Sequence, residues 1–198
     1  MTDVSPRATG AATPHRYDVI VVGARCGGAP TAMLLARQGA RVLLVDRAAF
    51  PSDSMRGHFL RGTAVDALAR WGLLDQVVAT GSPALATYLT DFGDGPMPTP
   101  VPLIDDGAPA LCAPRRIVLD AILVEAAAAA GVEVRQTFTV EDLIWDDGVV
   151  TGIVGRARGG DTVREQAHLV VGADGMRSLV ARRVDAPVYG NLPPLSCG

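Results

Sequence analysis

The sequence predicts an α/β fold, a Rossmann-like domain built on a mostly parallel sheet, from three observations. An apolar run at residues 17–22 breaks into a glycine-rich turn at residues 23–28. A second apolar run, residues 42–45, ends in Asp46, and a third leads into the sequence Gly-Ala-Asp-Gly within residues 169–175. A strand, glycine turn and helix, followed by a strand that ends in an acid, are typical of dinucleotide sites. In such sites the helix N-terminus binds phosphate and the acid binds ribose hydroxyls.

Composition limits the classes of partner. The 198 residues are enough for one sizeable core, or for one domain with a small second lobe. Hydrophobic residues make up 48% of the chain but aromatic residues only 5%, so alanine, valine and leucine must build the core. The formal charge is −3 and the basic residues form no run, so we expect no nucleic-acid partner.

The N-terminal residues and the cysteines indicate the expected cellular location of the protein. Residues 1–16 are rich in threonine, alanine, proline and glycine and are expected to form a flexible tail, without the apolar stretch of a signal peptide. The apolar run that follows is too short to span a bilayer, so we expect no stable membrane insertion. Cys26, Cys112 and Cys197 are scattered without metal-ligand spacing, which favours a reducing, cytoplasmic location and no metal site.

Hydrophobic periodicity and glycines indicate the other elements. Helices are expected from the glycine turn to near Gly39, at residues 62–71 and at residues 116–130, each followed by a glycine that suits a helix end. A loop is expected between them at residues 47–60. Strands are expected at residues 41–46, 132–135, 138–145, 149–157 and 163–168, with a separate strand at 169–171 that is apolar on both faces, as in buried parallel sheets.

The glycine turn departs from the usual G-x-G-x-x-G pattern. Gly23 and Gly28 hold the outer positions, but Arg25 occupies the middle one, where glycine normally lets the backbone approach the pyrophosphate. In one interpretation the Arg25 guanidinium joins the backbone amides in facing phosphate. In the other, this is a generic strand-to-helix turn with a solvated arginine. Asp46 is likewise either a ribose ligand or a solvated acid at a strand end.

Three motifs in order resemble one family. Residues 22–28, 116–120 and 172–178 resemble motifs of the para-hydroxybenzoate-hydroxylase-like monooxygenases and the related geranylgeranyl reductases, and the resemblance covers nearly all of residues 17–184. It implies a glutathione-reductase-type FAD-binding domain with a β-meander crossover and a partial, truncated β-rich substrate lobe. The implied division is a tail at 1–16, FAD-binding domain at 17–81 and 115–184, an excursion into the substrate lobe at 82–114, and the start of the truncated lobe at 185–198.

The resemblance also implies roles for single residues. Asp174 would bind the ribityl chain, Arg116 would reach the ribityl and pyrophosphate region, and Gly57 would approach the isoalloxazine ring. The alternatives are a turn-forming Asp-Gly pair for Asp174 and a solvated first-turn arginine for Arg116. Cys26 is expected to be a small buried filler rather than a redox thiol. The candidate cofactor-binding residues are Gly23, Ala24, Arg25, Cys26, Gly27, Gly28, Asp46, Arg47, Gly57, Arg116, Val140, Asp174 and Gly175.

The family's third FAD motif, a Gly-Asp turn before a late helix, is not found after Gly175. The resemblance implies an FAD-dependent oxidoreductase, foremost an NAD(P)H-using monooxygenase of an aromatic or apolar small molecule. One alternative is a reductase of isoprenoid double bonds, suggested by the loop around Gly57. Another, from a different class, is a non-catalytic FAD-binding fragment. The sequence identifies no catalytic residue and no oligomeric state.

Overall fold

The computed structural model describes residues 16–53, 59–83, 85, 87–100 and 111–190. In chain order the elements are β1 (Tyr17–Val22), α1 (Gly28–Arg37), β2 (Val42–Val45), α2 (Gly62–Trp71), α3 (Leu74–Ala79), β3 (Thr87–Asp91), β4 (Pro96–Pro100), α4 (Arg116–Ala129), β5 (Glu133–Arg135), β6 (Phe138–Asp146), β7 (Val149–Ala157), β8 (Thr162–Gly172) and α5 (Leu179–Arg183).

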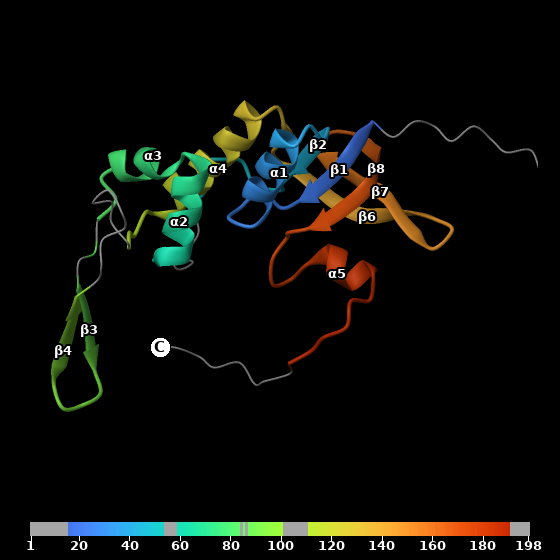
Figure 1. Ribbon diagram of the computed structural model, residues 1–198. Helices are drawn as coiled ribbons and strands as arrows, with labels where there is room; N and C mark the ends of the chain where they lie inside the picture. Colours follow the sequence, from blue (N-terminus) through green and yellow to red (C-terminus); the bar gives the residue numbers. More distant parts are fainter. Residues whose placement is uncertain (1–15, 54–58, 84, 86, 101–110, 191–198) are drawn as a thin grey trace, which may run out of the picture.

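Eight strands form two sheets in the described part of the chain, a larger one of six strands and a separate β3–β4 hairpin. The larger sheet has the order β5-β2-β1-β8-β7-β6. Strands β5, β2, β1 and β8 run parallel, whereas β8, β7 and β6 follow one another as an antiparallel meander (Figure 1). This arrangement confirms the predicted α/β class with a meander.

Strand β8 corrects one prediction. The sequence favoured two strands, at residues 163–168 and 169–171, but the structure has one strand of 11 residues. Its first half pairs antiparallel with β7, and its second half, from Ala167, pairs parallel with β1. Leu169 is 53% exposed rather than buried, because no described element covers that side chain. The apolar run is therefore not buried on both faces as expected.

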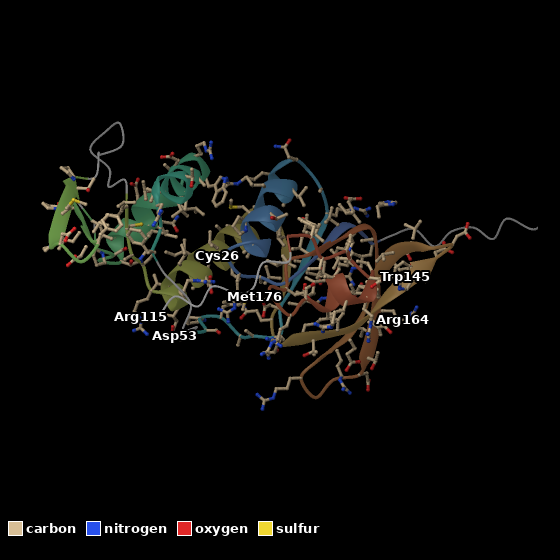
Figure 2. All side chains as sticks on the ribbon, turned by 90° about the horizontal axis from the view of Figure 1, so that it is seen from below. Cys26, Asp53, Arg115, Trp145, Arg164 and Met176 are labelled. Atoms are coloured by element: carbon tan, nitrogen blue, oxygen red, sulfur yellow. The ribbon has the colours of Figure 1, made fainter. Side chains whose placement is uncertain are left out.

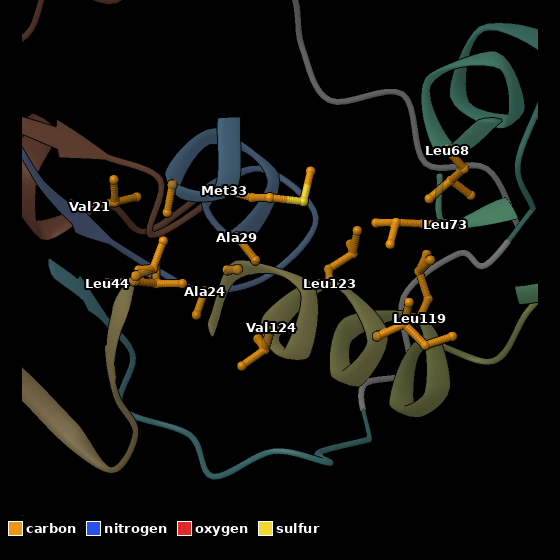
Figure 3. Close-up of a cluster of buried hydrophobic side chains, with 14 of the residues drawn as sticks. Val21, Ala24, Ala29, Met33, Leu44, Leu68, Leu73, Leu119, Leu123 and Val124 are labelled. Carbon is orange, nitrogen blue, oxygen red and sulfur yellow. The ribbon is translucent and has the colours of Figure 1, made fainter. Parts of the chain in front are cut away.

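One face of the parallel strands is covered by helices. Val19 and Val21 of β1 and Leu44 of β2 point to this side and contact a cluster that α1 and α4 complete. Figure 3 shows the cluster continuing from Met33 and Leu123 toward α2 and α3, where Leu68 and Leu73 lie. Helices α1 and α4 thus cover this face of the sheet and α2 and α3 extend the cluster, whereas Val180 of α5 belongs to the cluster on the other face.

The other face is covered by the meander. Ile20 and Leu43 are fully buried there against Phe138, Leu143 and Ile153 of the meander. Burial of a large aliphatic side chain contributes about 1.5–3 kcal/mol to stability. The side chains that alternate along β1 therefore pack against the helices on one face of the sheet and against the meander on the other.

Helix ends agree with the glycine signals. Gly72 adopts a left-handed conformation directly after α2, with φ of 75°, as expected for a C-cap glycine. Helix α3 and strand β4 were not predicted from the sequence. Figure 1 shows the β3–β4 hairpin standing apart from the other elements, and the predicted excursion at residues 82–114 stays a prediction.

No helix in the described residues is long and apolar enough to span a membrane.

Candidate functional site

Two segments far apart in the sequence meet at the carboxyl ends of β1 and β8. A Cβ on Gly23, whose φ is +102°, would lie 2.4 Å from the carbonyl oxygen of Ala173. A Cβ on Gly28 would lie 1.6 Å from the carbonyl oxygen of Gly23 and 3.2 Å from the Cβ of Ala173. The backbone N–H of Ala173 also donates to the carbonyl of Val22, at 2.8 Å. Gly23 is therefore required by close contact with the second motif, and Gly28 mainly by its contact with Gly23 inside the turn.

The N-terminus of α1 is open at this edge. Gly27 is the N-cap residue, no side chain caps the helix, and no heavy atom lies within 4 Å of where a Gly27 Cβ would be. The N–H groups of a first helical turn have no partners within the helix, and the helix dipole adds positive potential there. Within this turn the Ala29 N–H donates to the Arg25 carbonyl at 3.0 Å and Pro30 has no N–H, so the amides of Gly27 and Gly28, beside the free space, are the ones that suit a phosphate group.

Asp46 joins the end of β2 to the glycine turn. Its carboxylate accepts a hydrogen bond from the Ala24 backbone N–H at 2.7 Å and, on the other oxygen, one from the Ala48 N–H at 2.8 Å. A carboxylate oxygen can accept more than one hydrogen bond, so both oxygens retain capacity for further donors such as ribose hydroxyls. Asp46 is half-buried and is not merely a solvated acid.

Arg25 and Arg116 are brought together by a residue that the sequence analysis did not single out. Arg25 donates to the Asp120 carboxylate at 2.6 Å, and Arg116 donates to the same carboxylate at 2.8 Å. Asp120 is fully buried, and Arg25 also donates to the Ser52 hydroxyl at 2.9 Å. The guanidinium of Arg25 lies 5.5 Å from the centre of the Phe50 ring. The structure thus directs Arg25 toward α4 and the loop after β2, and its contact with phosphate stays a prediction.

Cys26 differs from its expected burial. The residue is exposed, because it lies in the turn ahead of α1, yet its Sγ lies 3.3 Å from a carboxylate oxygen of Asp120. Desolvation of the sulfur, followed by the adjacent negative charge, raises the pKa of the Cys26 thiol to about 11. A thiol that keeps its proton at neutral pH is a poor nucleophile, and the expectation that Cys26 is not a redox thiol stays a prediction.

The carboxylate of Asp174 has partners within the chain. It accepts hydrogen bonds from the Ser178 hydroxyl at 2.6 Å and from the Leu179 backbone N–H at 2.5 Å. Ser178 in turn caps α5 by accepting from the Ala181 N–H at 2.9 Å. Asp174 therefore anchors the start of α5 beside the glycine turn. A ribityl contact would be additional to this structural role and stays a prediction.

The other predicted site residues differ in solvent exposure. Arg47 is exposed and lines a cavity of about 460 Å³, whose other lining residues are Ala49, Thr137, Thr139, Arg156, Ala157, Arg158 and Gly159. Val140 is half-buried at a β-bulge of β6, with its side chain against the meander-side core. Gly175 is exposed in the turn before α5 and has φ of +82°. Gly57 lies outside the described residues.

A second arginine lies beside Arg116. Arg115 is exposed and pairs with Asp53 at 2.6 Å, and Figure 2 shows the two side chains together at one end of α4, with Trp145 and Arg164 far away on the meander. Asp120 was missed by sequence reasoning although it occupies position i+4 from Arg116, the spacing of a helical ion pair. That spacing was the available signal for Asp120. The described residues contain no group of three or more side chains able to hold a metal ion.

Comparisons with known proteins agree with this geometry. A family model described as FAD binding domain matches residues 16–193. The chain is 33% identical, over 84% of its length, to a digeranylgeranylglycerophospholipid reductase of Methanocella arvoryzae. It is 32% identical, over 89% of its length, to an aklavinone 12-hydroxylase of Streptomyces purpurascens. The chain spans only 41% and 36%, respectively, of these two proteins.

Solved structures show the same fold. Aklavinone-11 hydroxylase, in a ternary complex with FAD and aklavinone, superposes with a TM-score of 0.68 at 28% identity, over 87% of this chain and 35% of that one. The myxobacterial chondrochloren halogenase, an FAD-dependent halogenase, gives a TM-score of 0.73 at 25% identity, over 82% of this chain and 39% of that one.

Proposed function

Because this chain belongs to the FAD binding domain family, which matches it over residues 16–193, we propose that it forms the FAD-binding part of an NAD(P)H-dependent monooxygenase. The proposed substrate is an aromatic or apolar small molecule, in line with the hydroxylase relatives. The single observation that carries the proposal is the contact of the Gly23–Gly28 turn with Ala173, beside Asp46 and the uncapped α1 N-terminus.

These residues fit a flavin dinucleotide. The open side of Gly27 and the backbone N–H groups of Gly27 and Gly28 would receive the pyrophosphate, and Asp46 would accept the adenosine ribose hydroxyls. Arg116 would add positive charge on the ribityl side, next to the motif of Asp174. When bound, FAD accepts hydride from a nicotinamide and passes reducing equivalents to oxygen or to a substrate. This chain contributes binding and orientation of the dinucleotide.

A reductase of isoprenoid double bonds is the second candidate, favoured by the 33% identical reductase. The two chemistries differ in their need for oxygen. A monooxygenase consumes oxygen with NAD(P)H, whereas a double-bond reductase works under anaerobic conditions with a supplied reductant.

The test uses the full-length protein. The visible spectrum after purification, and after reconstitution with FAD, should show flavin absorbance that survives gel filtration. NADH and NADPH oxidation is then measured together with oxygen uptake, with aromatic polyketides and with isoprenoid lipids as candidate substrates. A protein that stays colourless after reconstitution but binds NAD tightly would refute FAD as its resident dinucleotide. Turnover of isoprenoids without oxygen would replace the monooxygenase proposal with the reductase.

A further inference from the structure

Asp120 is the one buried charged residue in the described part of the chain, with 0% of its surface exposed. It lies one turn into α4, where the helix packs toward the glycine turn. A strand-turn-helix dinucleotide site requires no acid at this place. A buried carboxylate is costly unless cations and donors surround it, so its partners indicate its purpose.

Those partners come from both sides of the site. Arg25 reaches the carboxylate from the glycine turn, Arg116 from the first turn of α4, and the Cys26 Sγ lies against the same group. The side chains of Arg25 and Arg116 are only 29% and 10% exposed. Two guanidinium groups this close repel one another, and the carboxylate between them offsets that repulsion. One acid and two bases leave a net charge of +1 beside the α1 N-terminus.

We infer that Asp120 is a positioning residue of the cofactor site. It holds Arg25 and Arg116 as a fixed pair of cations, so that the pyrophosphate and ribityl region of the dinucleotide meets guanidinium groups that are already oriented. The pair also accounts for an arginine at the middle position of the glycine turn. The Arg25 side chain leaves the turn toward Asp120 and Ser52, and the neighbouring space at Gly27 stays open. This inference rests on the proposed binding of FAD.

The experiment measures the dissociation constant of FAD for the full-length apoprotein by flavin fluorescence, well below the melting temperature. Asp120→Asn keeps the size of the side chain but removes its charge, and should weaken FAD binding about tenfold to a hundredfold. Arg25→Gln should weaken binding within the same range. The double variant should bind no more weakly than the weaker single variant, because the two groups act as a unit. Arg115→Gln, which breaks the exposed pair with Asp53, is the matched control and should stay within about twofold.

Each outcome decides the inference. Asp120→Asn with a lowered melting temperature but an unchanged dissociation constant would show a purely structural role and overturn it, as would strictly additive losses in the double variant. If Asp120→Asn does not fold, Arg25→Gln decides alone: unchanged FAD affinity would show that Arg25 is not one of a positioned pair of cations and would overturn the inference. Failure of the unaltered protein to bind FAD refutes the proposed function itself. Equal FAD dissociation constants for the unaltered protein and Asp120→Asn would refute only the positioning role.

Discussion

Replacing Gly28 with alanine is predicted to open the glycine turn. The added Cβ would lie 1.6 Å from the Gly23 carbonyl oxygen, whereas ordinary van der Waals contact begins at 3.4 Å. The turn must therefore widen by about 1.8 Å, the difference between these two distances. The obstructing atom belongs to the backbone, and on the other side the Ala173 Cβ lies at 3.2 Å, so no side-chain rotation relieves the clash.

The cost follows from that geometry. Overpacking in a close-packed interior costs about 1–3 kcal/mol, and a backbone obstacle places Gly28→Ala at the upper end. About 3 kcal/mol would lower the melting temperature of a 198-residue folding unit by roughly 6–12 °C, and that of a larger full-length protein by less. Widening the turn also displaces the first amides of α1 beyond hydrogen-bond reach of a phosphate, so FAD binding should weaken at least about tenfold.

The assay is thermal unfolding of the full-length apoprotein, followed by FAD titration. Gly27→Ala is the matched control for stability, because no heavy atom lies within 4 Å of its new Cβ and its φ is negative. We expect that variant to unfold within about 0.5 kcal/mol of the unaltered protein. Equal melting temperatures for Gly28→Ala, Gly27→Ala and the unaltered protein would show that Gly28 is not in the close contact described here.

Three further predictions concern single side chains. Asp46→Ala should weaken FAD binding about tenfold to a hundredfold through loss of charge-assisted hydrogen bonds, and unchanged affinity in the titration would make Asp46 a structural acid only. With Cys112 and Cys197 replaced by alanine, Cys26 should react with iodoacetamide at pH 8 far more slowly than a model peptide thiol, because its pKa is raised to about 11; a rate equal to the peptide's would contradict this. Desolvation and the hydrogen bond to Glu133 raise the pKa of Tyr17 to about 12 from 10.0. The folded state therefore keeps a proton that the unfolded chain loses, and stability to urea should fall from pH 10 to 12, less steeply in Tyr17→Phe; parallel profiles would argue against it.

The sequence predicted those elements best in which local and long-range signals agree. Helix α2 begins at Gly62 and ends at Trp71 as expected, because its apolar spacing and the left-handed Gly72 act within one segment. Strand β8 was wrongly predicted as two strands. The local sequence gives no signal that a single strand changes its pairing partner at Ala167. Helix α3 has only six residues, too few for a periodic pattern, and β4 contains prolines, which argue against a strand.

The candidate site was likewise predictable only where local sequence signals agree with long-range contacts. The meeting of Gly23 and Gly28 with residues 172–174 could be expected, because parallel strands bring their carboxyl ends to one edge. The pairing of Arg25 with Asp120 could not, since 95 positions separate the two residues and only the docking of α4 on α1 joins them. The same docking places the sulfur of the exposed Cys26 beside the buried Asp120 carboxylate.

The pairing of β1 with β8 sets an order in which the chain can be completed during synthesis. Strand β1 can pair with β2 early in synthesis, as in the pair Val19 and Val42. Its other neighbour is β8, which pairs Ala167 with Tyr17 and is synthesised far later. Until β8 has left the ribosome, one edge of β1 has no partner strand, and the glycine turn lacks the backbone of Ala173 against which it packs. A nascent chain that ends before Ala173 therefore has no completed binding edge. Cofactor uptake cannot assist its folding, and closing so long a loop slows the step that follows.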